Sequence, residues 1–353
     1  MSGVIFMHAA SGPLRGELTL GWHGVNLLVS LSFTAVPLFF MMSGSLLLSS
    51  PRTADLKHLW GRRIPRLVLP LVFWSGVTLL LLWHWGDLTP DQALERFLEV
   101  PQTPVYTHLW YLYTLIALYA ISPLLYAMVR GLDRAGARYL VGLIAAVLGL
   151  GMLRTLAPGA LQGWLRLDLA DALRFLEGHL FSFLLGYYLL RREREIANWK
   201  LLTLAGLFLA VITVGTWLKT RQAGAYSAAF QLQNEGWEIG LAALIFLLAK
   251  QNLRRPPRLG LTRELVRLSM PIYLVHLLVT RWLWRLGLAP TRLRLLPLDF
   301  LLILGISYLI SKTLASVPGL CRISTGIPWP EARETCSWQA TFRRLRRKDP
   351  SPT

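Results

Sequence analysis

The sequence predicts an all-α membrane protein, a polytopic bundle of about ten transmembrane helices. The composition is one reason, because 54% of the 353 residues are hydrophobic and only 16% are charged, whereas a soluble domain carries roughly 25% charged residues. Long apolar runs are the other. Residues 66–85 and 201–218 reach the length of about 20 residues that a helix needs to cross ~30 Å of hydrocarbon.

Apolar segments divide the chain into a membrane domain, residues 1–315, and a basic tail, residues 316–353, which we expect to be cytoplasmic and partly disordered. The first segment looks truncated, because it holds about half of the apolar length needed to cross. Cys321 and Cys336 lie in the tail at a spacing that fits neither a zinc site nor a disulfide framework, so we expect free thiols. The ten segments are 1–11, 24–48, 66–85, 107–129, 139–156, 173–190, 200–218, 236–250, 268–286 and 297–315.

The basic residues predict how the chain is oriented. The loops 49–66, 130–138, 191–200 and 250–267, with the tail, contain 25 Lys and Arg, and the alternate loops contain 11. Cytoplasmic loops carry the excess of Lys and Arg, so both termini are expected in the cytoplasm. The net charge of +18 is thus spread over loops, whereas a nucleic-acid-binding protein gathers its charge on one face.

Between the third and fourth segments, residues 87–100 predict an amphipathic helix on the outer side of the membrane. Pro90 would begin this helix, and its apolar stripe would consist of Leu94, Phe97 and Leu98.

Several polar side chains fall inside apolar segments, where they are costly and therefore indicate a function. His8, His276 and the pair Glu177 and His179 are in such positions. Imidazole is suited to taking and returning a proton near neutral pH. A histidine that only hydrogen-bonds a neighbouring helix is the alternative for His8 and His276.

Three short motifs have a structural interpretation, and the second of them also has a functional one. Ser43 and Gly44 suit close helix packing. Arg63 and Arg66 share a helix face, either as a positive-inside anchor or as a phosphate clamp, because guanidinium groups present a fork of donors. The stretch HLWYLYTLIALY, which begins at His108, is explained by an interfacial aromatic belt.

In chain order, these motifs resemble the acyltransferase-3 family of integral membrane O-acyltransferases, and in particular its branch that modifies cell-envelope polysaccharides. The similarity spans about residues 1–325. It rests on His8 and on the stretches VPLFFMMSGSLLL, RRIPRLVLPLVFWS, HLWYLYTLIALYAISPLL and SMPIYLVHLLV.

The resemblance implies a multi-pass enzyme of the bacterial inner membrane that moves an acyl group, usually acetyl, from cytoplasmic acyl-CoA to a glycan or lipid-linked sugar. By this likeness His8 is the catalytic histidine, acting as a base or as an acyl relay. The family's SG motif and paired arginines match the donor-binding candidates Ser43, Gly44, Arg63 and Arg66, to which we add Arg62. No bound cofactor, metal or nucleic acid is expected.

The remaining polar residues are candidates for the acceptor side or for a structural role: His108, Trp110, Glu177, His179 and His276.

The chain departs from the family pattern at its start. The family has an Arg or Lys eleven residues before the catalytic histidine, three helical turns and about 16 Å away on the same face. The corresponding position before His8 would be −3, so we expect either a truncated chain or a decayed homologue.

A transporter or exporter of a glycan or an acylated metabolite is the alternative function, since buried polar groups in ten helices would serve it equally well. An inverted repeat would favour transport, and none is visible in the sequence.

Overall fold

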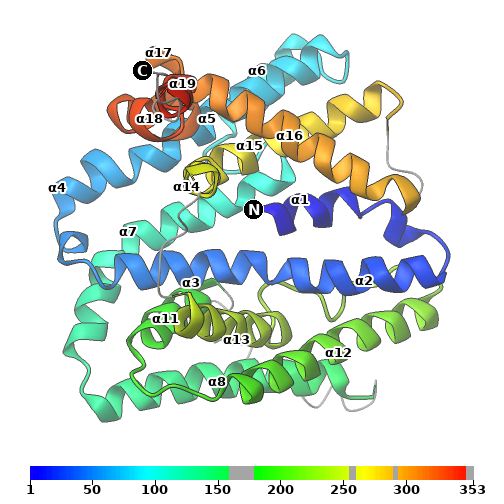
Figure 1. Cartoon of the computed structure of the whole chain (residues 1–353), viewed down its shortest axis with the longest axis vertical. Coiled ribbons are helices and arrows are strands. Elements are labelled where there is room, and N and C mark those ends of the chain that lie inside the picture. Colours follow the sequence, from blue (N-terminus) through cyan, green and yellow to red (C-terminus); the bar gives the residue numbers. More distant parts are fainter. Residues whose placement is uncertain (159–178, 254–259, 289–292, 347–353) are drawn as a thin grey trace, which may run out of the picture.

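The computed structural model describes residues 1–158, 179–253, 260–288 and 293–346. All regular secondary structure in these residues is helical (Figure 1). The α-helices are α1 (Ser2–Ala9), α2 (Leu20–Phe33), α3 (Ala35–Leu47), α4 (Leu56–His58), α5 (Pro65–His84), α6 (Pro90–Leu98), α7 (Trp110–Gly131), α8 (Arg134–Leu156), α11 (His179–Arg191), α12 (Asn198–Ala223), α13 (Gly236–Asn252), α14 (Gly260–Arg267), α15 (Ser269–Arg285), α16 (Leu296–Ala315), α17 (Pro318–Thr325), α18 (Trp329–Thr335) and α19 (Trp338–Arg346).

The all-α membrane fold is confirmed, and the described part of each of the ten predicted segments contains helix. The number of about ten spans is not confirmed. Among the described residues, six helical stretches are long and apolar enough to cross a membrane: Leu20–Leu47, Leu56–His84, Thr107–Gly131, Arg134–Leu156, Asn198–Ala223 and Leu293–Ala315. The helices α1, α13 and α15 have 8, 17 and 17 residues. At 1.5 Å per residue they are shorter than ~30 Å of hydrocarbon.

The continuous stretch of α2 and α3 runs across the middle of the bundle (Figure 1). The helices α11 and α13 pack against α3, and α12 packs against α2. On the other side, α1 lies against α2 and α16 and also contacts α15. The short first helix therefore lies inside the bundle, with Val4, Ile5 and Ala9 buried.

The predicted amphipathic helix is confirmed as α6. It begins at Pro90, and Thr89 and Gln92 cap it reciprocally: each side chain accepts the backbone N–H of the other residue. Such a capping box satisfies two donors that a helix start leaves free. The helix packs against α5. Leu94 and Leu98 are 61% and 69% exposed, as expected for a helix that lies on a membrane surface.

At each end of the bundle, hydrogen bonds connect helix ends and loops that are distant in the sequence. At one end, Lys250 donates to the carbonyl of Leu189 at 2.9 Å, and Gln251 exchanges two hydrogen bonds with the backbone of Ile196. These residues belong to two regions that the charge distribution assigns to the same side. At the other end, Arg281 in the last turns of α15 binds Asp87 in the loop after α5 at 2.8 Å, and the charges also assign these two regions to a common side.

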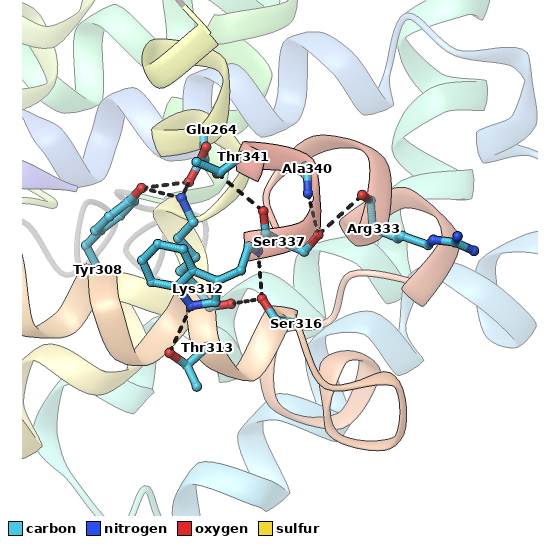
Figure 2. Close-up of polar contacts among 10 residues, drawn as sticks. Glu264, Tyr308, Lys312, Thr313, Ser316, Arg333, Ser337, Ala340 and Thr341 are labelled. Carbon is cyan, nitrogen blue, oxygen red and sulfur yellow. Dashed lines mark hydrogen bonds and ion pairs between the residues drawn. The ribbon is translucent and has the colours of Figure 1, made fainter. Parts of the chain in front are cut away.

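Residues 318–346 form the three short helices α17, α18 and α19, which pack over the ends of α5, α14 and α16. Lys312 of α16 forms a buried ion pair with Glu264 at 2.5 Å (Figure 2). Its ammonium group lies 4.4 Å from the ring centre of Trp338 in α19. Both cysteines are buried and free, as predicted. Residues 347–353 of the predicted tail lie outside the described residues.

Candidate active site

His8 lies in contact with a second histidine at the centre of the bundle. Its ring centroid is 5.3 Å from that of His276, and His276 is in turn 5.3 Å from His108. The three side chains come from α1, from α15 and from the turn that precedes α7. His108 and His276 are 3% and 0% exposed, whereas His8 is partly exposed. His8 is therefore the member of this histidine cluster that a substrate can reach most directly.

Backbone hydrogen bonds define the orientation of the two buried rings. The Nε2 of His108 lies 3.0 Å from the carbonyl oxygen of Leu274, and the Nδ1 of His276 lies 2.5 Å from that of Tyr273. A carbonyl only accepts hydrogen bonds, so these two nitrogens carry the protons. In neutral rings, His108 Nδ1 and His276 Nε2 are then acceptors, and neither has a partner among the described residues. The cluster thus holds two buried lone pairs that can accept a proton.

Tyr273 holds the cluster together, and our sequence-based selection missed it. Its hydroxyl donates to the carbonyl of His108, and its own carbonyl accepts from His276. Tyr273 lies three residues before His276 in the stretch SMPIYLVHLLV, so the two residues share one face of α15. This spacing was the signal in the sequence that could have pointed to it.

A cavity of about 200 Å³ lies beside the histidine cluster. Its polar lining includes Ser43, Tyr111, Tyr119 and Tyr273, and its apolar lining comes from α1, α3, α5, α7 and α15. Ser43 interacts with the phenol of Tyr111, whose ring centroid is 5.5 Å from that of Tyr273. The first residue of the SG motif therefore faces the space that adjoins the histidines.

The paired arginines lie near Tyr119, one of the residues that line this cavity. Arg63 and Arg66 both act electrostatically on the phenol of Tyr119, which lines the cavity. Arg63 is the last residue of a π-helical turn, Leu59–Arg63, and Arg66 is the second residue of α5. The two arginines are thus separated by a junction between two kinds of helix.

The arginines differ in their surroundings. Arg63 is half-buried and donates to the hydroxyl of Thr53 at 2.9 Å and to that of Ser50 at 3.4 Å, so part of its donor capacity is used within the protein. Arg62 and Arg66 are exposed. Arg66 is therefore the arginine beside Tyr119 that is more accessible to a ligand.

Gly44 has a structural position that the motif alone did not reveal. A Cβ atom on Gly44 would lie 1.8 Å from the carbonyl oxygen of Phe183, and one on Gly186 would lie 2.0 Å from that of Met41. The two glycines thus allow the backbones of α3 and α11 to touch, the small-residue packing that membrane helices use. Gly44 faces α11, whereas Ser43 faces the cavity.

The remaining acceptor-side candidates form a second aromatic group. His179 stacks on Trp110 with the ring centroids 4.9 Å apart, and Phe40 lies 4.5 Å away. Phe40 and Trp110 both contact Tyr111, which joins this group to the cavity. Glu177 lies outside the described residues.

The aromatic-belt interpretation of the stretch around His108 is wrong for its first residues. His108, Leu109 and Tyr111 are buried inside the bundle, at 3%, 0% and 9% exposure, whereas a belt would face the membrane surface. Lys312 was also missed, although a lysine inside an apolar segment is an obvious signal. No metal-binding group of three or more His, Cys, Asp or Glu side chains occurs among the described residues.

Several helices can cross a bilayer, and they enclose a cluster of histidines beside a small cavity. The class of protein is therefore a polytopic membrane protein with a buried polar site. A family model described as an acyltransferase domain matches residues 1–315. The chain therefore belongs to the acyltransferase-3 family and is a membrane acyltransferase. No curated protein and no solved structure matches it.

Proposed function

We propose that this acyltransferase moves an acyl group, acetyl in the simplest case, from acyl-CoA to a hydroxyl group of a cell-envelope glycan. The observation that carries the proposal is the position of the cavity between two chemically different ends. Arg63 and Arg66 lie near Tyr119 at one end, and the histidine cluster lies near Tyr273 at the other. Under this proposal, phosphate binding and proton transfer occur on opposite sides of one space.

Arg66, with Arg63 and Arg62, would hold the phosphate groups of coenzyme A. Guanidinium groups bind phosphate through two parallel charge-assisted hydrogen bonds. These residues lie in a region that the charge distribution assigns to the cytoplasm, the compartment that contains acyl-CoA. The thioester end of the donor would then extend into the cavity past Tyr119 and Ser43.

His8 would act as the general base. The acceptor oxygen attacks the thioester carbonyl carbon, a C–O bond forms, and the C–S bond breaks as the tetrahedral intermediate collapses. His8 takes the proton of the acceptor hydroxyl and returns it to the departing thiolate, so that the products are the ester and the free thiol of coenzyme A. Transfer through an acyl-histidine intermediate gives the same products and uses the same residue.

His108, Trp110 and His179 would lie toward the acceptor. They lie around the N-terminus of α7, at the end of the bundle opposite to the arginines. Membership of the acyltransferase family favours this function over the transporter alternative.

A labelled-donor experiment tests the proposal. Inverted membrane vesicles that contain the full chain receive acyl-CoA with the label in the acyl group, and the label in base-labile esters of the envelope glycan is counted. We expect label in the glycan with the wild-type chain and none with His8→Ala at equal protein level. Equal labelling by vesicles without the protein would overturn the proposal.

A further inference from the structure

A second cavity, an apolar groove of about 410 Å³, lies between α5, α15 and α16. All twelve side chains that line it are apolar or aromatic, from Phe73 to Trp85 on α5 and from Val275 to Trp282 on α15. The α5 part spans about 18 Å along the helix, more than half of ~30 Å of hydrocarbon. Its size is that of a ligand site, within roughly 300–1,000 Å³.

One end of the groove carries a cluster of charges. The guanidinium group of Arg285 lies 4.9 Å from the ring centre of Trp85, which lines the groove. Arg285 and Arg281 bind Asp87 at 2.5 Å and 2.8 Å. The hydrogen bond from Arg281 lowers the pKa of the Asp87 carboxyl below its ordinary value, so this group is ionised at neutral pH. The cluster of two arginines and one aspartate therefore keeps one uncompensated positive charge.

Arg281 has unused donor capacity. Its Nε is buried and has no hydrogen-bond partner among the described residues. A guanidinium group has five N–H donors arranged to match a phosphate or carboxylate. An anion at this end of the groove would satisfy the buried donor.

Exposed tryptophans indicate how deep in the membrane the charged end of the groove lies. Trp83, Trp282 and Trp284 are 48%, 45% and 48% exposed, and tryptophan is enriched where the hydrocarbon meets the headgroups. The arginine cluster thus lies at headgroup depth, and the groove extends from it into the hydrocarbon layer.

Side-chain contacts lead from the arginine cluster to the histidine cluster. Arg281 interacts with the phenol of Tyr106, and the ring centroid of Tyr106 is 5.8 Å from that of His108. His108 in turn lies against His276. A ligand bound by Arg281 would therefore lie next to the candidate active site.

We propose that the groove binds the lipid anchor of the acyl acceptor. The hydrocarbon chain fills the groove, Arg281 and Arg285 bind the phosphate or diphosphate of the lipid, and the attached sugar is directed toward His108 and His8. This inference rests on the proposed function and names its substrate class, a phosphate-linked lipid glycan. A soluble polysaccharide would use neither the groove nor the arginine cluster.

A lipid-retention experiment tests this inference without the acyl donor. The full chain is placed in nanodiscs of phosphatidylcholine doped with equal amounts of undecaprenyl phosphate and phosphatidylglycerol, and bound lipid is identified by native mass spectrometry. We expect the wild-type protein to retain undecaprenyl phosphate preferentially. The double variant Arg281→Gln, Arg285→Gln should retain at least about tenfold less, because charge-assisted hydrogen bonds are lost.

Two further variants and two controls make the experiment specific. Val77→Trp fills the groove and should also reduce retention of undecaprenyl phosphate about tenfold. If Val77→Trp aggregates during gel filtration, Ile306→Trp is used in its place. Asp87→Asn removes the competing carboxylate and should increase retention. The matched controls are Arg138→Gln and Val214→Trp, which change exposed side chains on α8 and α12 and should behave as the wild type.

The outcomes separate the inference from the proposed function. Equal retention of phosphatidylglycerol, or full retention by Val77→Trp, would overturn the groove as an acceptor site. His8→Ala should retain undecaprenyl phosphate normally while it loses acyl transfer. If the wild-type protein transfers acyl groups but retains no lipid, only the inference about the groove is contradicted. If it retains the lipid but transfers no acyl group, only the proposed function is contradicted.

Discussion

The imidazole rings of His8 and His276 lie 5.3 Å apart, with their planes inclined by 45°. They bring the first helix of the chain into contact with α15, which is near its other end. The Nδ1 of His276 is engaged by the carbonyl of Tyr273, so only Nε2 of this ring can act as a base. The pair offers two candidate proton acceptors, and mutagenesis can separate them.

Replacing His8 by alanine should abolish acyl transfer, because the acceptor hydroxyl loses its base. General-base catalysis contributes typically 10²–10⁴-fold to the rate, so we expect a loss of about that size in the acyl-ester content of the surface glycan. Protein level and gel-filtration profile serve as controls.

The variant His276→Asn is the matched comparison. An asparagine side chain can still donate to the carbonyl of Tyr273 but has no equivalent of the Nε2 lone pair. If His8 is the base, His276→Asn retains most of the activity. Full acylation by His8→Ala, together with an inactive His276→Asn, would assign the role to His276.

Replacing Arg66 by lysine should weaken the use of acyl-CoA, with an increase in KM for the donor. A lysine provides a point charge in place of a bidentate fork, whereas a topological anchor would function with either residue. The measurement is acyl transfer over a range of acyl-CoA concentrations. Arg138→Lys, at an exposed position on α8, is the control. Unchanged kinetics in the Arg66→Lys variant would leave only the anchor role.

Gly44→Ala should destabilise the bundle, because the added Cβ would lie 1.8 Å from the carbonyl oxygen of Phe183. The helices α3 and α11 must then move apart, and overpacking of this kind typically costs about 1–3 kcal/mol or more. Gly186→Ala should behave alike, and Gly206→Ala, which meets no atom within 4 Å, should not destabilise. Thermal unfolding of the purified protein in detergent measures the effect. Equal melting temperatures for Gly44→Ala and Gly206→Ala would contradict this packing.

Lys312→Met should also destabilise the protein, because it removes the cation that binds the buried carboxylate of Glu264 at 2.5 Å. Both side chains are 3% exposed, and removing one partner of a buried pair costs roughly 3–5 kcal/mol. The double variant Lys312→Met, Glu264→Gln should recover part of this loss. Arg267→Gln breaks the exposed pair with Glu331 and should cost no more than about 1 kcal/mol. Thermal unfolding of the wild type and the three variants provides the comparison, and similar losses of stability for Lys312→Met and Arg267→Gln would contradict the larger contribution of the buried pair.

Reporter fusions at residues 95 and 345 should report opposite sides of the membrane, with residue 345 in the cytoplasm. The expectation follows from the 25 basic residues on one set of loops against 11 on the other. An alkaline phosphatase fusion active at residue 95 and inactive at residue 345 would agree with it. The same activity at both positions would refute this topology.

The sequence by itself determined the helices and the class of protein. Apolar length and composition predict the membrane helices, and Pro90 and the apolar pattern after it predict α6. The motif order from His8 to His276 indicates the acyltransferase-3 family, which the match over residues 1–315 establishes. These features are local, because helix formation and membrane insertion depend on residues within about one segment of each other.

Only the tertiary structure decided which polar residues meet. His8, His108 and His276 converge from three segments, and Gly44 turns toward α11 while its neighbour Ser43 lines the cavity. Arg281 of α15 and Asp87 of the loop after α5 meet at one end of the groove. Each contact depends on how helices rotate and cross, and small residues and ridge packing over the whole bundle set that geometry. A periodic pattern in one segment records which residues share a face of its helix and not which helix that face will meet.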